Sequence, residues 1–271
     1  MYPKLLTASG ARQVPWGKFG INRNSPQATG LEAWYSPIAS RGSDVLRDMS
    51  GRGQDMTWSG NLEYVSDPKL GMVANYDGSS FQSVEVALRG AAYPSAVFIW
   101  FKTTTSGDYI YSEGTLSYDE CMYMHLPSAG RVTWMIYDSV GTSAYIMLFD
   151  VNPNPLDGEW HVFGGVSWAE DDHEVFYDGK SIGTSVSVPT GGPFIRSAIG
   201  GLRYGPGPFV TGHFNGQIGD VRVYRDNVPT PAQILQMAHP PTMWDLYQPV
   251  SRYWPVSVAA TGNPWYYYAQ Q

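Results

Sequence analysis

The residues best suited to acid–base chemistry stand close together in the second half of the chain. Glu170, Asp172 and Glu174 occupy alternate positions, with polar residues between them. Two carboxyl groups held about 5–5.5 Å apart can serve as nucleophile and general acid in glycoside hydrolysis. That chemistry needs a rigid support, yet this run falls between strands expected to end at Trp168 and to start near Val175. We therefore interpret the run as a solvated hairpin turn and predict no catalytic residue.

Other reactive residue types show no pattern that predicts a site. Cys121 lies in an apolar strand with no histidine at a suitable spacing, which indicates core packing. It is the single cysteine, so no intrachain disulfide is predicted. The Gly-Gly pairs at 191–192 and 200–201 lie in β context and do not open a helix that could bind phosphate. Zinc is not predicted, because the histidines are not clustered: His125, His161, His173, His213 and His239.

Composition limits the classes of partner. The net charge of −7 and the absence of any Lys/Arg cluster exclude a nucleic-acid partner. No apolar run approaches membrane-spanning length, so no membrane partner is predicted. Residues 1–17 lack the apolar segment of a signal peptide, and we expect synthesis in a reducing cytoplasm. Aromatic residues make up 14% of the chain, which suits a large contact surface.

Short apolar segments separated by turn residues predict an all-β sandwich of two antiparallel sheets. The segment 96–102 is apolar on both faces, which is typical of a central strand. We see no internal repeat and no linker between residues 30 and 240. The main expected strands are 31–35, 81–86, 96–102, 109–111, 121–124, 131–137, 144–149, 160–168, 174–177, 181–188, 198–202 and 217–224.

One short helix is expected after the last strand. Thr230 is a good N-cap, Pro231 suits the first helical position, and Gln233 completes a capping box. Pro240 and Pro241 should end the helix. Its predicted apolar stripe consists of Ile234, Leu235 and Ala238.

The chain divides into an N-terminal arm (1–29), a sandwich (30–240) and an aromatic C-terminal arm (241–271). Three consecutive tyrosines near the end of the chain should be buried against something, because exposed apolar patches promote aggregation. Either the arms dock on a partner or the C-terminal arm folds back on its own sandwich. The candidate docking residues are Tyr2, Leu5, Leu6, Trp16, Phe19, Trp244, Leu246, Tyr247, Trp254, Trp265, Tyr266, Tyr267 and Tyr268.

Three motifs resemble the laminin-G-like, concanavalin A-like jelly rolls. They are the strand–turn–helix of 215–237, the strand 158–166 that carries Trp-His, and the Val-Phe-Tyr-Asp-Gly hairpin of 175–179. The resemblance implies a jelly-roll sandwich with one short C-terminal helix and extended terminal arms. It does not by itself imply a function, because this fold hosts lectins, adhesins, glycosidases and scaffolds.

The resemblance also bears on metal and catalysis. Many proteins of this fold bind a structural calcium, and Gly219 stands where the family usually has an aspartate ligand. Asp220 is the remaining candidate ligand for calcium, and no other cofactor is predicted. The spacing of 170–174 resembles that of laminarinase-type glycoside hydrolases, but both intervening residues are polar here rather than apolar.

The segment 244–249 (Trp-Asp-Leu-Tyr-Gln-Pro) resembles an extension found on laminin-G-like proteins of tailed bacteriophages. The resemblance implies a non-enzymatic virion protein, in capsid decoration or in a fibre or tail. Its partners would be neighbouring virion proteins or copies of itself, reached through the arms, and its sandwich could also bind surface glycans. The alternatives are a stand-alone carbohydrate-binding module of a cell-surface or secreted protein, and a glycoside hydrolase built on 170–174.

Overall fold

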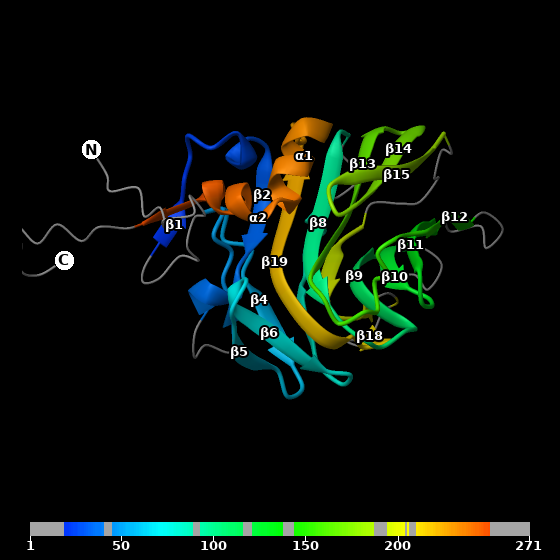
Figure 1. The fold of residues 1–271 in the computed structure, drawn as a ribbon, viewed down its shortest axis with the longest axis horizontal. Helices are drawn as coiled ribbons and strands as arrows, with labels where there is room; N and C mark the ends of the chain where they lie inside the picture. Colours follow the sequence, from blue (N-terminus) through cyan, green and yellow to red (C-terminus); the bar gives the residue numbers. More distant parts are fainter. Residues whose placement is uncertain are drawn as a thin grey trace, which may run out of the picture.

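The fold is a sandwich of two large antiparallel sheets (Figure 1), as the strand pattern predicts. The computed structural model describes residues 19–40, 45–88, 93–115, 121–137, 144–186, 194–203, 205 and 210–249. Within these ranges, no helix is long and apolar enough to cross a membrane. Several candidate docking residues lie outside the described residues: Tyr2, Leu5, Leu6, Trp16, Trp254, Trp265, Tyr266, Tyr267 and Tyr268.

The first sheet is organised around its longest strand, β19. Its hydrogen-bonded order is β15 (Lys180–Ser185), β14 (Asp172–Tyr177), β13 (His161–Ala169), β8 (Ser95–Lys102), β19 (Asn215–Arg225), β6 (Gly71–Asp77) and β5 (Glu63–Asp67). One edge of β19 pairs with β8, and the other pairs first with β6 and then with β2 (Leu31–Tyr35). Strand β19 thus pairs with three other strands.

The second sheet has the order β12 (Ala144–Asp150), β11 (Arg131–Tyr137), β10 (Cys121–Leu126), β9 (Asp108–Gly114), β16 (Arg196–Ile199), β7 (Phe81–Val84), β4 (Met56–Ser59) and β3 (Val45–Leu46). Two short pairs complete the described strands: β17 (Leu202–Arg203) with β18 (Val210–Thr211), and β1 (Phe19–Ile21) with β20 (Tyr247–Pro249). The helical elements are α1 (Pro231–Ala238), α2 (Pro240–Met243) and the 3₁₀ turns η1 (Pro26–Ala28), η2 (Pro37–Ser40) and η3 (Trp244–Leu246).

The main core fills the space between the two sheets. Strand β8 contributes Val97, Ile99 and Phe101 to it, and the second sheet contributes side chains such as Trp134 and Met124. All of these side chains are buried. The neighbouring residues of β8 point away from this core and are buried as well. The prediction of a central strand covered on both faces is therefore confirmed.

A second core lies on the other face of the first sheet. Trp34, Phe98 and Trp100 project from that face and are covered by residues of α1, α2 and η3. In Figure 1, α1 and α2 lie across β19 and β2. The helices therefore close the outer face of the first sheet, which would otherwise expose large aromatic side chains to water.

Helix α1 begins as its sequence predicts. The Thr230 side chain accepts from the Gln233 backbone N–H, and the Gln233 side chain accepts in return from the Thr230 backbone N–H. The predicted apolar stripe is only partly right. Ile234 and Met237 are buried, whereas Leu235 is 50% exposed.

His161, at the start of β13, lies between two carboxylates. Its Nδ1 is 2.9 Å from Asp178 Oδ2, and its Nε2 is 3.0 Å from Asp157 Oδ1. Its ring is buried and stacks on Tyr177. Burial alone would lower the pKa of His161, but hydrogen bonds to Asp178 and Asp157 outweigh it and raise the pKa. The protonated ring can donate to both carboxylates and so joins two turns.

We expect the contribution of His161 to stability to depend on pH. A raised pKa stabilises the fold fully below the unfolded-state value of about 6.5, and the effect is lost as pH rises through the folded-state pKa. Burial would raise the pKa of Asp157, but hydrogen bonds from the Glu159 backbone and His161 lower it. The contribution of Asp157 to the stability of the fold is therefore present above the pKa of its unfolded state. It is lost as pH falls through the lowered pKa of the folded state.

The substitution His161→Gln should therefore lower the free energy of unfolding more at about pH 5.5 than at about pH 9. Urea denaturation at the two pH values measures both losses. His239→Gln, which changes an exposed histidine, is the control and should show no such difference. An equal loss at both pH values for His161→Gln would contradict this interpretation.

Candidate functional site

Asp220 and Arg222 form a buried ion pair on β19, facing the second core. Their side chains are 3% and 0% exposed. Asp220 Oδ2 accepts from Arg222 Nε at 2.7 Å. Asp220 Oδ1 accepts from Trp34 Nε1 at 2.7 Å and from the Tyr247 hydroxyl at 2.9 Å. Both carboxylate oxygens are thus engaged by protein donors.

Arg222 connects the sheet to both ends of the described chain. Its guanidinium donates to Gln27 Oε1 on η1 and to the Met243 carbonyl at 2.9 Å on α2. It also lies over the Trp100 ring, 4.7 Å from the ring centroid. Burial alone would lower the pKa of Arg222, but the charge of Asp220 outweighs it and raises the pKa. A buried charge of this kind is tolerated only when its donors are satisfied, as most are here.

The segments 19–28 and 240–249 form what we call the terminal seam. β1 pairs antiparallel with β20, so that Phe19 lies opposite Pro249. The Asn22 backbone N–H donates to the Leu246 carbonyl at 2.7 Å. The seam therefore joins the two ends of the sandwich on the outer face of the first sheet.

The terminal seam differs from the expectation of free docking arms. Trp244, Leu246 and Tyr247 are at most 8% exposed and belong to the second core. Their partners lie in this chain because the Asp220–Arg222 pair attracts the Tyr247 hydroxyl and the Met243 carbonyl. The alternative of a tail folded back on its own sandwich is confirmed for these three residues. The boundary expected at 240/241 separates residues that the structure packs together.

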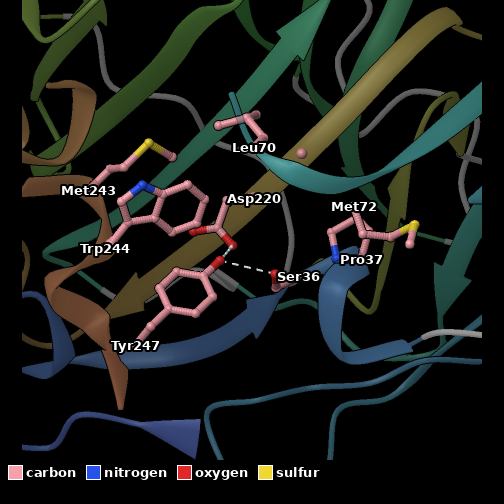
Figure 2. Close-up of a pocket in the computed structure, with 9 residues that line it drawn as sticks. Ser36, Pro37, Leu70, Met72, Asp220, Met243, Trp244 and Tyr247 are labelled. Carbon is pink, nitrogen blue, oxygen red and sulfur yellow. Dashed lines mark hydrogen bonds between the residues drawn. The ribbon is translucent and has the colours of Figure 1, made fainter. Parts of the chain in front are cut away.

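A small pocket lies beside this ion pair (Figure 2). Figure 2 shows the Tyr247 hydroxyl between Asp220 and Ser36, with Trp244 close by and Leu70 beyond Asp220. The volume of this pocket is about 10 Å³, room for about one water molecule. Sites for small-molecule ligands usually measure about 300–1,000 Å³. We interpret this pocket as part of the joint between sheet and terminal seam.

The residues around Asp220 do not fit the predicted calcium site. Calcium takes 6–8 oxygen ligands, whereas Asp220 is surrounded by the N–H donors of Arg222 and Trp34 and one hydroxyl. The described part of the chain holds no group of three or more His, Cys, Asp or Glu side chains placed to bind a metal. The geometry around Asp220 thus gives the calcium prediction no support.

We expect Arg222→Met to lower the free energy of unfolding by about 3–5 kcal/mol, because it leaves Asp220 as an uncompensated buried charge. Urea denaturation measures this change. Lys69→Met is the control: it breaks an ion pair with Glu159 in which both side chains are more than half exposed, so it should have little effect. Similar small losses in both variants would show that the buried pair does not hold the joint.

The other outer face of the sandwich belongs to the second sheet. Strand registers place one residue from each of seven strands, β4 to β12 in the order of the sheet, in a single row across it: Thr57, Ser83, Ala198, Ser112, Tyr123, Met135 and Ile146. The side chains of Met122 and Met124 flank Tyr123 in sequence and point into the main core. Small residues therefore form the middle of this row, and Tyr123 stands beside them.

Tyr109, Tyr123 and His125 form an aromatic group on this face, which we call the tyrosine–histidine cluster. The Tyr109 and His125 rings stack with centroids 4.5 Å apart, and Tyr109 meets Tyr123 edge-on at 4.9 Å. All three side chains are partly exposed. Burial lowers the pKa of His125, so the ring is neutral at neutral pH. The cluster offers apolar ring surface with polar groups at its edges.

A hairpin crosses this face beside the cluster. The Ser112 hydroxyl donates to the Gly201 carbonyl and accepts from the Arg203 backbone N–H, both at 2.9 Å. After β18, the Gly212 carbonyl accepts from the Tyr109 backbone N–H at 3.1 Å. A Cβ at Gly212 would lie 2.3 Å from the Tyr109 ring, so only glycine allows this approach. The hairpin thereby fixes one side of the cluster.

The predicted reactive residues lie elsewhere. Glu170 and Asp171 occupy the turn between β13 and β14, while Asp172 and Glu174 lie on β14. Glu174 accepts from Trp168 Nε1 at 3.2 Å. Burial raises the pKa of Cys121 to about 12, so its thiol stays protonated, in agreement with the packing role predicted for it.

The tyrosine–histidine cluster is not among the site residues predicted from the sequence. The signal was present in the alternation of Cys121 to Leu126, where Met122 and Met124 face the core and Tyr123 and His125 face outward. Tyr109 was harder to place, because the register between β9 and β10 shifts beside it.

Comparison with known proteins identifies the family of this fold. Residues 75–235 match the family described as the concanavalin A-like lectin/glucanases superfamily. The chain belongs to this superfamily. The expected jelly-roll fold is therefore confirmed, and the bacteriophage context stays a prediction. Comparison with curated protein sequences gives no match.

Several solved structures share the fold of this superfamily member. Domain 4 of AbnA, an extracellular arabinanase from Geobacillus stearothermophilus in complex with arabinotriose, matches with a TM-score of 0.59 and 16% identity, over 77% of this chain and 98% of that one. The binding domain of botulinum neurotoxin serotype D matches with a TM-score of 0.59 and 10% identity, over 78% of this chain. The binding domain of Paraclostridial Mosquitocidal Protein 1 gives 0.58 and 11%, also over 78%. The chain spans about half the length of the two toxin domains, 52% of each.

Proposed function

We propose that this chain is a non-enzymatic, glycan-binding adhesion protein, and that its terminal arms attach it to a bacteriophage particle. The observation that carries the proposal is the tyrosine–histidine cluster on the outer face of the second sheet. The opposite outer face is closed by the chain's own helices and terminal seam. On the second sheet Ala198 and Ser112 are buried, whereas the rings of the cluster are partly exposed and can meet a ligand.

The chemistry of the cluster suits a sugar. Sugar rings present apolar C–H groups on their faces and hydroxyl groups at their edges. Tyrosine rings offer apolar surface and a hydroxyl, and ligand sites typically combine aromatic walls with a few placed polar groups. Tyr109 and Tyr123 provide the walls, and neutral His125 provides a ring nitrogen. The structure of the arabinanase domain with arabinotriose supports glycan binding by a related fold.

A binding role is favoured over catalysis. Glu170 lies in a turn, and Glu174 already accepts a hydrogen bond from Trp168. A retaining glycosidase needs two carboxyl groups on rigid supports, about 5–5.5 Å apart. The tyrosine–histidine cluster itself contains no carboxylate.

The position of the terminal seam supports attachment of the chain to the particle through both arms at one end of the sandwich. Because Phe19 lies opposite Pro249, the two ends of the described chain lie side by side. Figure 1 shows β1 at one end of the longest axis and β10 to β12 at the other. Attachment through the arms would leave β10 to β12 at the end away from the particle. The remaining docking residues proposed here are Tyr2, Leu5, Leu6, Trp16, Trp254, Trp265, Tyr266, Tyr267 and Tyr268.

A second candidate is a stand-alone carbohydrate-binding module of a cell-surface or secreted protein. It is favoured by the match to nearly the whole of the arabinanase domain. Both candidates use the same face for the sugar, and they differ in what the arms do.

A glycan that binds the chain is first found by array screening. Tyr123→Ala should raise the Kd for this glycan about tenfold, which corresponds to ~1.4 kcal/mol, because the substitution removes a ring on which the sugar stacks. Calorimetric titration of the full chain measures the change. The control is Tyr93→Ala, at a 36% exposed tyrosine near His173 of the first sheet, and it should bind as the wild type does. Equal effects of the two substitutions, or binding to no glycan, would contradict the proposal.

Deletion of residues 1–18 and 250–271 should abolish self-association without altering glycan affinity. Light scattering after size-exclusion chromatography measures the assembly state, and the same titration measures affinity. A full-length chain that is monomeric, and unaffected by the deletion, would favour the stand-alone module instead.

A further inference from the structure

An exposed ion pair lies on the outer face of the second sheet, where β11 begins and β12 ends. Arg131 Nε is 2.8 Å from Asp150 Oδ1, and the two residues lie opposite each other in the strand register. The neighbouring residues Val132 and Phe149 pack against the main core, so the ion pair points outward. Its two side chains are 49% and 83% exposed. A guanidinium and a carboxylate are therefore accessible on the face that carries the tyrosine–histidine cluster.

Leu148 stands beside this ion pair on β12. Met147 and Phe149 pack against the main core, so Leu148 between them points outward, as Asp150 does two residues later. Leu148 is 46% exposed. A single exposed leucine is ordinary on a protein surface, but this one adjoins two exposed charged groups. Together the three side chains offer an apolar surface, hydrogen-bond donors and hydrogen-bond acceptors.

The strand register connects these three side chains to the cluster. His125 lies opposite Thr133 on β11, and Thr133 lies opposite Leu148. Thr133 has the shortest side chain of this row and is 4% exposed, whereas His125 and Leu148 on either side of it reach solvent. The hairpin of β17 and β18 contacts the cluster at Tyr109, on the side away from β12. The cluster and Leu148 therefore belong to one row of side chains across β10, β11 and β12.

The spacing of the strands sets the size of a ligand that contacts both groups. Neighbouring strands lie about 4.8 Å apart, so β10 and β12 are separated by about 10 Å. Arg131 lies two residues from Thr133, which is roughly 7 Å along β11. One sugar ring is shorter than these spans, whereas two linked sugar units cover them.

We propose that Leu148, Arg131 and Asp150 form a second sugar subsite, so that the ligand is a neutral oligosaccharide of at least two linked units lying across β10 to β12. This inference rests on the proposed glycan-binding function and names the length and the charge class of its ligand. One unit packs on the tyrosine–histidine cluster. The next unit places the C–H groups of its ring on Leu148 and its hydroxyl groups against the ion pair.

The chemistry of the ion pair suits hydroxyl groups. An arginine carries five N–H donors and a carboxylate about four acceptor positions, and the contact between Nε and Oδ1 uses one of each. Two hydroxyl groups on neighbouring sugar carbons can therefore donate to Asp150 and accept from Arg131. The two charges cancel, so the pair exerts no net attraction on an ionised sugar. A neutral sugar unit is the ligand class that matches it.

The dependence of binding on glycan length tests the second subsite. The full chain is applied to an array of mono-, di- and trisaccharides of glucose, galactose, mannose, rhamnose and N-acetylglucosamine. The Kd of each length is then measured for every series that binds. We expect the disaccharide of at least one series to bind at least about tenfold more tightly than its monosaccharide, a difference of ~1.4 kcal/mol. This preference should persist at high salt, because it does not depend on a net charge.

Two variants locate the second unit. Arg131→Gln and Leu148→Ser should each remove most of the preference for the disaccharide and leave the Kd of the monosaccharide unchanged. Both change exposed side chains, so the fold should be retained. The matched controls are Lys69→Gln, which breaks the exposed ion pair with Glu159, and Leu235→Ser, at a 50% exposed leucine of α1. Both controls should bind as the wild type does.

The outcomes separate this inference from the proposed function. Equal affinity for mono- and disaccharides, or a preference that both variants retain, overturns the second subsite and leaves glycan binding at the cluster standing. A preference that is lost at high salt overturns the neutral ligand class. Binding to no member of the array overturns the inference, and binding to no glycan on a broader array of cell-surface glycans overturns the proposed function as well.

Discussion

The buried Asp220–Arg222 ion pair is the contact on which the arrangement of the sandwich depends. It lies on β19, the strand that joins β8, β6 and β2. An arginine removed from water must have its donors satisfied, and Arg222 finds acceptors in Asp220, in Gln27 and in the carbonyl of Met243. The cost of burying this charge thereby fixes both terminal segments against one face. The terminal seam is a consequence of that electrostatic requirement.

This joint gives the two outer faces of the sandwich different roles. The first sheet has its outer face covered by α1, α2 and the terminal seam, which bury Trp34 and Trp100. The second sheet carries the partly exposed rings of Tyr109, Tyr123 and His125 beside the buried small residues Ser112 and Ala198. The chain thus covers the outer face of the first sheet with its own residues, whereas the outer face of the second sheet presents three partly exposed rings. The proposed attachment at the terminal seam and the proposed recognition at the second sheet are compatible because they use opposite faces.

The sequence predicts local structure well where the signal is local. The capping box of Thr230 and Gln233 and the central strand 96–102 are confirmed because three to seven neighbouring residues determine each. The sequence left open whether the C-terminal segment folds back on the sandwich, since the contacts that hold it are distant: Trp34 and Tyr247 reach Asp220 from 186 and 27 residues away. No local pattern encodes such contacts. The outward direction of Tyr123 and His125 follows from alternation, but their meeting with Tyr109 depends on a register shift between β9 and β10.

We propose that the outer face of the second sheet, and not the pocket beside Asp220, contacts a glycan. Backbone amide chemical shifts of the isotope-labelled full chain, followed by NMR while a glycan found by array screening is added, test this proposal most directly. We expect the largest shifts to cluster at Tyr109, Tyr123 and His125. Shifts that cluster instead at Met72 and Trp244 beside the pocket, or no shifts, would contradict the proposal.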